Sequence, residues 1–213
     1  MYYYVDLEGH TEGINSVAVS PDGRFIVSGS WDETAKVWDS TTKECVGTLE
    51  GHTSMISSVA VSPDGRFIVS GSDDKTAKVW DSTTKECVGT LEGHTQGISS
   101  VAVSPNGRFI VSGSWDMTAK VWDSVTKEFQ RDLINCNDND NLFYCHESVG
   151  SICFLSNEYV VIAGGDVASV VSLSGEENRN ALLLWKNYDK RRDLFLKGDV
   201  ALIKGMLQKL LEK

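Results

Sequence analysis

The amino-acid sequence repeats itself. Residues 9–50, 51–92 and 93–134 are three copies of one unit; the first two copies differ at five positions, and the second and third differ at eleven. A fixed period of about 40 residues is typical of folds in which each unit is one small group of secondary-structure elements packed against the next.

Each unit contains four short runs of strand-forming residues separated by turn residues. In the first unit these runs are 16–19, 25–30, 34–38 and 45–49, and Pro21-Asp22-Gly23 supplies a tight turn after the first run. Four antiparallel strands that recur at this period predict one blade of a β-propeller.

Three short motifs recur at fixed places in each unit. A unit begins with Gly-His, carries an Asp in the turn between the second and third runs, and ends the third run with Trp-Asp; in the first unit these are Gly9-His10, Asp32 and Trp38-Asp39. This pattern resembles the WD-repeat (G-protein beta-like) β-propeller family, and the resemblance covers residues 1–134. It implies a ring of wedge-shaped blades that acts as a rigid platform for protein partners.

A fourth, degenerate unit follows over residues 135–199. Runs at 150–155, 159–166 and 181–187 align with the first three strands, with an insertion before the third run. Residues 200–213 leave the repeat pattern, and their apolar residues fall at helical spacing. We therefore expect an all-β propeller region over 1–199, with three regular blades and one degenerate blade, followed by a short amphipathic C-terminal helix over 200–213.

The number of blades leaves the arrangement open. Four units are few for a propeller, and residues 2–7 align with the last strand of a unit whose other three strands are absent. Three arrangements fit: an open arc, a ring made from two copies, or a fragment of a longer protein. Open blade edges would favour self-association.

Every regular unit contains a His, a Ser and an Asp, the residue types of a hydrolytic triad. An active site needs one accessible nucleophile, whereas this set occurs three times, which argues against an enzyme. By the family resemblance, these residues and the Trp of the Trp-Asp pair form a buried hydrogen-bond network that fixes the blade geometry. The expected structural network consists of His10, Ser28, Asp32 and Trp38; His52, Ser70, Asp74 and Trp80; and His94, Ser112, Asp116 and Trp122.

Differences between the units indicate a binding surface. All five differences between the first two units lie in the loop that enters the first strand and in the turn between the second and third strands, at one end of the blade. The third unit varies at the same positions and elsewhere. Because loops vary on a rigid scaffold, this distribution favours a partner-binding face. Its candidate residues are Gly13, Asn15, Trp31, Met55, Ser57, Asp73, Gly97, Ser99 and Trp115.

Trp31 and Trp115 precede the turn Asp and should lie on the rim of this face. Exposed tryptophans are typical anchors at binding hot spots. The alternative is that each Trp packs on the loop of the neighbouring blade. The sequence supports both interpretations equally.

Composition narrows the functional classes. The net charge of −10 argues against nucleic-acid binding. The chain has no apolar run long enough to span a membrane and no signal-peptide pattern, so we expect a cytoplasmic protein with no membrane partner. Neither the spacing of Cys136, Cys145, His146 and Cys153 nor the pair Asp138 and Asp140 fits a metal site, so we expect no metal and no cofactor.

The sequence therefore predicts a non-catalytic scaffold that binds other proteins or peptides through the loop face. An alternative is a regulatory or accessory subunit that docks onto a catalytic chain through the helix expected at 200–213. Deleting that helix would remove partner binding only in the second case.

Overall fold

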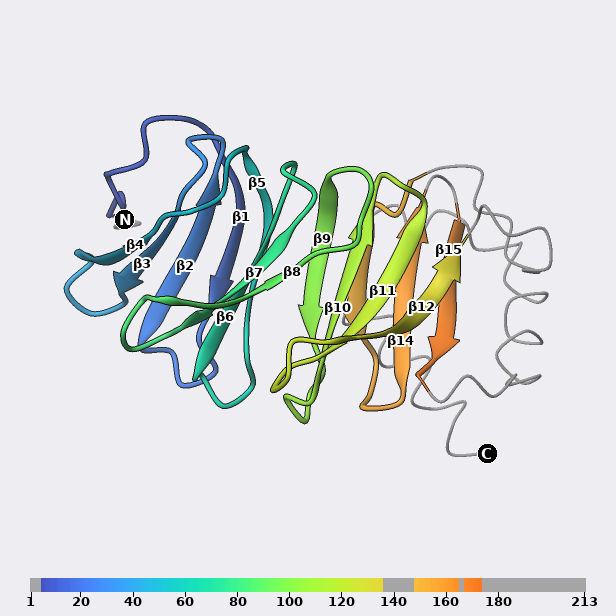
Figure 1. The fold of residues 1–213 in the computed structure, drawn as a ribbon. Helices are drawn as coiled ribbons and strands as arrows, with labels where there is room; N and C mark the ends of the chain where they lie inside the picture. Colours follow the sequence, from blue (N-terminus) through green and yellow to red (C-terminus); the bar gives the residue numbers. More distant parts are fainter. Residues whose placement is uncertain (1–4, 136–147, 165–166, 174–213) are drawn as a thin grey trace.

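The computed structural model describes residues 5–135, 148–164 and 167–173, which form antiparallel sheets and no helix (Figure 1). Within each sheet, every strand pairs with the next strand along the chain. The first sheet contains β1 (Ile14–Val19), β2 (Phe25–Ser30), β3 (Ala35–Asp39) and β4 (Cys45–Leu49). The second contains β5 (Ile56–Val61), β6 (Phe67–Ser72), β7 (Ala77–Asp81) and β8 (Cys87–Leu91).

The third sheet contains β9 (Ile98–Val103), β10 (Phe109–Ser114), β11 (Thr118–Asp123) and β12 (Phe129–Asn135). In the described residues, the fourth sheet contains β13 (Ser151–Phe154), β14 (Tyr159–Gly164) and β15 (Val167–Ser172). The expected all-β architecture of repeated four-stranded blades is therefore confirmed for the three regular units. Closure into a ring stays a prediction.

Local side-chain chemistry shapes the turn between β1 and β2. The Ser20 hydroxyl donates to Asp22 Oδ1 at 2.7 Å, and the Arg24 N–H donates to the same oxygen at 3.0 Å. Gly23 between them has a φ of 73°, a backbone conformation that favours glycine. Because the second and third units repeat this turn, the chain reverses direction at the same point after the first strand of each regular unit.

Neighbouring sheets stand side by side through their first strands, and in Figure 1 they follow one another from left to right. The N–H of Val59 in β5 donates to the Ser16 hydroxyl of β1 at 3.0 Å, and equivalent bonds join the later sheets. Apolar side chains fill the space between the sheets, so each hydrophobic core belongs to two units. Between the first and second sheets this core includes Val27, Val37, Leu49, Ile56, Ile68 and Trp80.

The outer side of β1 is an exception to this packing. Val17 is 66% exposed, whereas its equivalents Val59 and Val101 are 6% and 5% exposed. Ile14 and Val19 are also exposed. The first sheet therefore presents an exposed apolar edge, whereas the equivalent residues of the second and third sheets are buried. Self-association through the exposed edge stays a prediction.

The third strand of the fourth sheet does not lie where the sequence pattern predicts. This strand is β15, which pairs with β14 from Tyr159↔Ser172 to Gly164↔Val167, and not the run at 181–187. The residues of β15 are mostly β-branched or small and follow β14 almost directly, so the nearest segment in the chain forms the hairpin. The sequence pattern places an insertion here because the run at 181–187 contains a tryptophan, Trp185, that matches the Trp of the Trp-Asp pair.

Several expectations fall outside the described residues. These include the run at 181–187, the domain boundary at 199 and the C-terminal helix over 200–213, which nothing in the structure supports. In the described part of the chain, no helix has the length and apolar character needed to cross a membrane.

Candidate functional site

A chain of hydrogen bonds links four side chains inside the second unit. The indole Nε1–H of Trp80 donates to Ser70 Oγ at 2.8 Å, and Ser70 Oγ lies 2.8 Å from His52 Nε2. The other ring nitrogen, His52 Nδ1, lies 2.7 Å from Asp74 Oδ2. These contacts connect the central strands to the loop before β5 and to the turn between β6 and β7.

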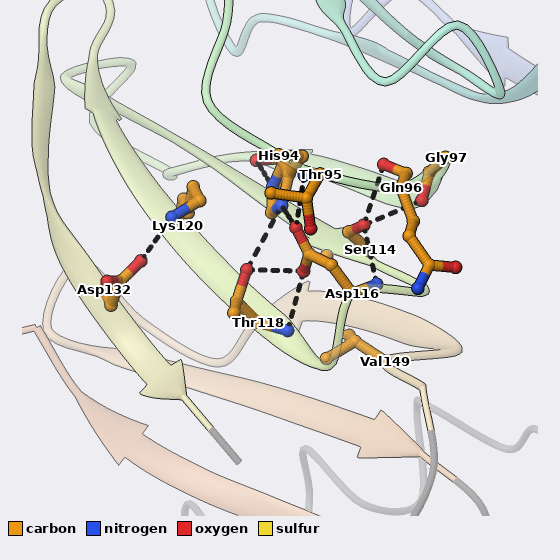
Figure 2. Close-up of polar contacts among 12 residues, drawn as sticks. His94, Thr95, Gln96, Gly97, Ser114, Asp116, Thr118, Lys120, Asp132 and Val149 are labelled. Carbon is orange, nitrogen blue, oxygen red and sulfur yellow. Dashed lines mark hydrogen bonds and ion pairs between the residues drawn. The ribbon is translucent and has the colours of Figure 1, made fainter. Parts of the chain in front are cut away.

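The first and third units contain the same network. Its distances stay between 2.7 and 2.8 Å in both units. Figure 2 shows His94 of the third unit pointing toward Asp116, with Thr118 bonded to both. The network residues in these units are His10, Ser28, Asp32 and Trp38, and His94, Ser112, Asp116 and Trp122.

The direction of each bond follows from the acceptor at its end. A carboxylate only accepts, so His52 Nδ1 carries the proton and Nε2 accepts from the Ser70 hydroxyl. Burial lowers the pKa of His52 below its ordinary value of 6.5, although the hydrogen bond to Asp74 acts in the opposite direction. Burial likewise lowers the pKa of His94. Both imidazoles are therefore held neutral.

The pKa of the carboxylate at the end of this hydrogen-bond chain is set by a different balance. Burial alone would raise the pKa of Asp74, but hydrogen bonds from Thr76 and His52 outweigh it, and the net pKa is lowered. The same balance lowers the pKa of Asp116. The network thus pairs a neutral imidazole with a charged carboxylate.

These contacts match those of a hydrolytic triad in distance but not in accessibility. A nucleophile must be reached by its substrate. The side chains of Ser28, Ser70 and Ser112 are buried, with exposed fractions of 3%, 0% and 0%. Each hydroxyl also accepts a hydrogen bond from a buried indole. The arrangement therefore joins strands and loops inside the sheet.

Sequence reasoning missed two further groups in each unit. In the second unit, Thr76 donates to Asp74 Oδ1 through both its N–H and its hydroxyl, at 2.9 and 2.7 Å. The Ser72 hydroxyl donates to the Ser54 carbonyl at 2.9 Å and accepts from the Asp74 N–H at 3.1 Å. The signal was available, because all three units carry Ser and Thr two residues before and after the turn Asp.

These bonds tie together the two loops that vary between the units. The Asp74 carboxylate also accepts from the Thr53 N–H at 3.1 Å, so the turn after β6 and the loop before β5 share one buried anchor. The variable residues beside this anchor therefore sit on a fixed base.

Trp31 lies on the rim of this loop face, as its position in the repeat predicts. It is 56% exposed, and its N–H donates to the Gly13 carbonyl at 2.9 Å. Its indole donates to Asn15 Oδ1 at 2.5 Å, and the Asn15 amide in turn donates to the Ile56 carbonyl of the next sheet at 3.0 Å. Trp31 is thus held in place and still accessible.

The other units place their variable turns in the same way. The N–H of Asp73 donates to the Met55 carbonyl at 3.1 Å, and that of Trp115 donates to the Gly97 carbonyl at 3.0 Å. Trp115 is 54% exposed. Gly13 and Asn15 are exposed, whereas the remaining candidates are half-buried: Met55, Ser57, Asp73, Gly97 and Ser99.

Ser99 differs from the other candidates. Its hydroxyl contacts the carbonyl oxygens of Gly113, at 3.1 Å, and Val149. It lies at the junction of the third and fourth sheets, where it joins backbone groups. In the described residues, no group of three or more His, Cys, Asp or Glu side chains is placed to hold a metal ion.

Four-stranded antiparallel sheets, stacked through their first strands and each fastened by an internal network, define a repeat protein built from blades of the β-propeller type. The sequence family described as "WD domain, G-beta repeat" matches residues 3–39, 43–81 and 85–123. The chain belongs to this WD-repeat family, and the resemblance read from the sequence is confirmed. Each matched segment ends at the Trp-Asp pair of a unit.

Similarity to individual curated proteins extends over about one repeat. The "Ribosome biogenesis protein BOP1 homolog" of Drosophila grimshawi is 49% identical over 41 residues, and that of Aedes aegypti is 43% identical over 42 residues. These matches cover 19% and 20% of this chain and 5% of each relative. The chain therefore spans a small part of the length of these relatives.

Proposed function

We propose that this protein is a non-catalytic scaffold that binds other proteins or peptides through the loop face carrying Trp31, Asp73 and Trp115. The observation that carries the proposal is the exposure of two tryptophans on loops that a buried network holds in place. Large aromatic side chains presented on a rigid base lose little conformational entropy on binding, and they are the usual anchors of interfaces.

Two further observations support this assignment. The repeated serines are buried and engaged by indoles, which suits a structural role better than a nucleophilic one. WD-repeat domains as a family serve as interaction platforms, so the family membership favours a binding function. The alternative of docking through residues 200–213 falls outside the described residues.

Location and pathway stay proposals. We propose a cytoplasmic location on the grounds given by the sequence alone. The role in ribosome biogenesis that the names of the relatives state belongs to proteins with which this chain shares one repeat. That likeness therefore assigns no pathway here.

Replacing Trp31 and Trp115 together by alanine should weaken partner binding at least tenfold, because hot-spot residues commonly contribute 2 kcal/mol or more. Partners recovered with the wild-type protein would be purified, and their direct binding to both proteins measured by calorimetry. The melting temperature should stay nearly unchanged, since both side chains lie on the rim.

The matched control is Val125→Ala, which removes an exposed apolar side chain in the turn between β11 and β12, at the opposite end of the sheet. It should leave binding intact. A large fall in melting temperature for the double variant would show that the tryptophans serve packing. Unchanged binding would refute the proposed face.

A further inference from the structure

A continuous set of contacts crosses the loop face over three sheets. From the first sheet, the Trp31 indole bonds to Asn15, and the Asn15 amide donates to the Ile56 carbonyl. Ile56 follows Met55, whose carbonyl accepts from the Asp73 N–H. Trp31 and the turn that carries Asp73 are therefore neighbours along this face.

The path continues from Asp73 into the third sheet. A Cβ built on Gly97 would lie 2.5 Å from Asp73 Oδ1 and 3.0 Å from Asp73 Cα, so glycine at this position makes room for the carboxylate. The Gly97 carbonyl in turn accepts from the Trp115 N–H at 3.0 Å. In the order of the sheets, Asp73 lies between the two exposed tryptophans.

The Asp73 carboxylate differs from the other turn acids. Asp32, Asp74 and Asp116 each bind a histidine and a threonine of their own unit. In the part of the chain that the structure describes, no hydrogen bond or ion pair engages the Asp73 side chain. A half-buried carboxylate beside exposed aromatic rings offers two complementary groups to one ligand.

The loops around Asp73 also carry mainly negative charge. Among the residues that the structure describes, the exposed charged side chains at this end of the sheets are one lysine, Lys75, and several glutamates. These glutamates are Glu8, Glu12, Glu33, Glu50 and Glu92. The turns at the opposite end interleave both signs, as in Asp22-Gly23-Arg24 and Lys43-Glu44. The loop face is therefore the end of the molecule that attracts a cation.

We infer that this face recognises an arginine side chain in a basic segment of a partner peptide, with Asp73 as the pairing carboxylate and Trp31 or Trp115 as the stacking surface. The guanidinium group is planar, stacks on aromatic rings and pairs with carboxylates. A neutral side chain of the same shape would lose the ion pair and the cation–π contact. This inference rests on the proposed function and specifies the class of ligand that the loop face takes.

The probe is the capped peptide acetyl-Gly-Arg-Gly-amide, titrated into the ¹⁵N-labelled chain of 213 residues. Its citrulline counterpart, which is neutral and nearly the same shape, is titrated in parallel. Chemical shifts of the Trp31 and Trp115 indole N–H groups report binding at the face. The arginine peptide should shift at least one of these signals and bind about tenfold more tightly than the citrulline peptide. Raising the salt concentration should weaken it.

Asp73→Asn should weaken arginine binding about tenfold while keeping the size of the side chain. The matched control is Glu44→Gln, which removes one negative charge at the opposite end and should leave binding within about twofold, because distant exposed charges are screened. Equal binding of the two peptides, or no effect of Asp73→Asn, would overturn the inference.

The two proposals fail in different ways. If the arginine preference is absent but the Trp31 and Trp115 double variant still loses its protein partner, the scaffold stands and the cationic ligand is wrong. If the arginine peptide binds but the double variant keeps its partner, the face binds arginine and the partner docks elsewhere.

Discussion

Replacing Trp80 by alanine is expected to lower the free energy of unfolding by about 3–5 kcal/mol. The indole is 1% exposed, lies in the apolar core between the first and second sheets, and donates to Ser70 Oγ. Its removal therefore leaves a cavity shared by two units and deprives a buried hydroxyl of its donor. Urea denaturation followed by circular dichroism measures the loss.

The control for this experiment is Trp31→Ala. Trp31 is 56% exposed, so removing its ring should change the unfolding free energy by only about 0.5 kcal/mol. The same substitution at two positions thus separates the buried Trp of the Trp-Asp pair from the Trp of the rim. Equal losses for the two variants would contradict the distinction between network and face.

Gly71→Ala is expected to destabilise the protein by about 1–3 kcal/mol through overpacking. A Cβ at this position would lie 2.6 Å from Ile98 Cγ2 and 2.9 Å from Val101 Cγ1, and both neighbours are buried branched side chains of the next sheet. Neither can turn away without opening the junction between the second and third sheets. The change would appear as a lower urea midpoint.

Gly47→Ala provides the comparison. Its Cβ would come as close as 2.8 Å to Lys85 Cγ, but that long, partly exposed side chain can move aside at little cost. The expected change is about 0.5 kcal/mol or less. Equal urea midpoints for the two variants would contradict the inference that glycine at position 71 lets the second and third sheets approach closely.

The regular units were predictable because local and long-range signals agree in them. Turn residues such as Asp22 and Gly23 mark where each strand ends, and the alternating apolar residues mark its buried side. The fourth unit lacks this agreement: Ile162 occupies the register position of Ser28, so no network is anchored there. The repeat pattern therefore does not mark the third strand of this unit, and the strand-forming segment directly after β14 aligns as an insertion.

The loop face was predictable in outline only. Comparing the units identified the variable loops and placed Trp31 and Trp115 on the rim. It did not show that Ser99 bonds backbone carbonyls at a sheet junction, or that Asn15 spans two sheets. Such contacts depend on the distance between neighbouring sheets, and a single unit of sequence does not specify that distance.

The repeated histidines are internal supports of the sheets, and burial holds His52 and His94 in the neutral state. The pKa values of His52 and His94 are lowered below 6.5 in the folded protein, so the unfolded chain binds protons first as the pH falls. The direct test is the free energy of unfolding, measured by urea denaturation at intervals from pH 7.5 to 5.5, a range in which carboxylates with lowered pKa values stay ionised. We expect full stability above pH 6.5 and a progressive loss below it. Stability that stays constant or rises as the pH falls through 6.5, as an accessible histidine beside a carboxylate would give, contradicts it.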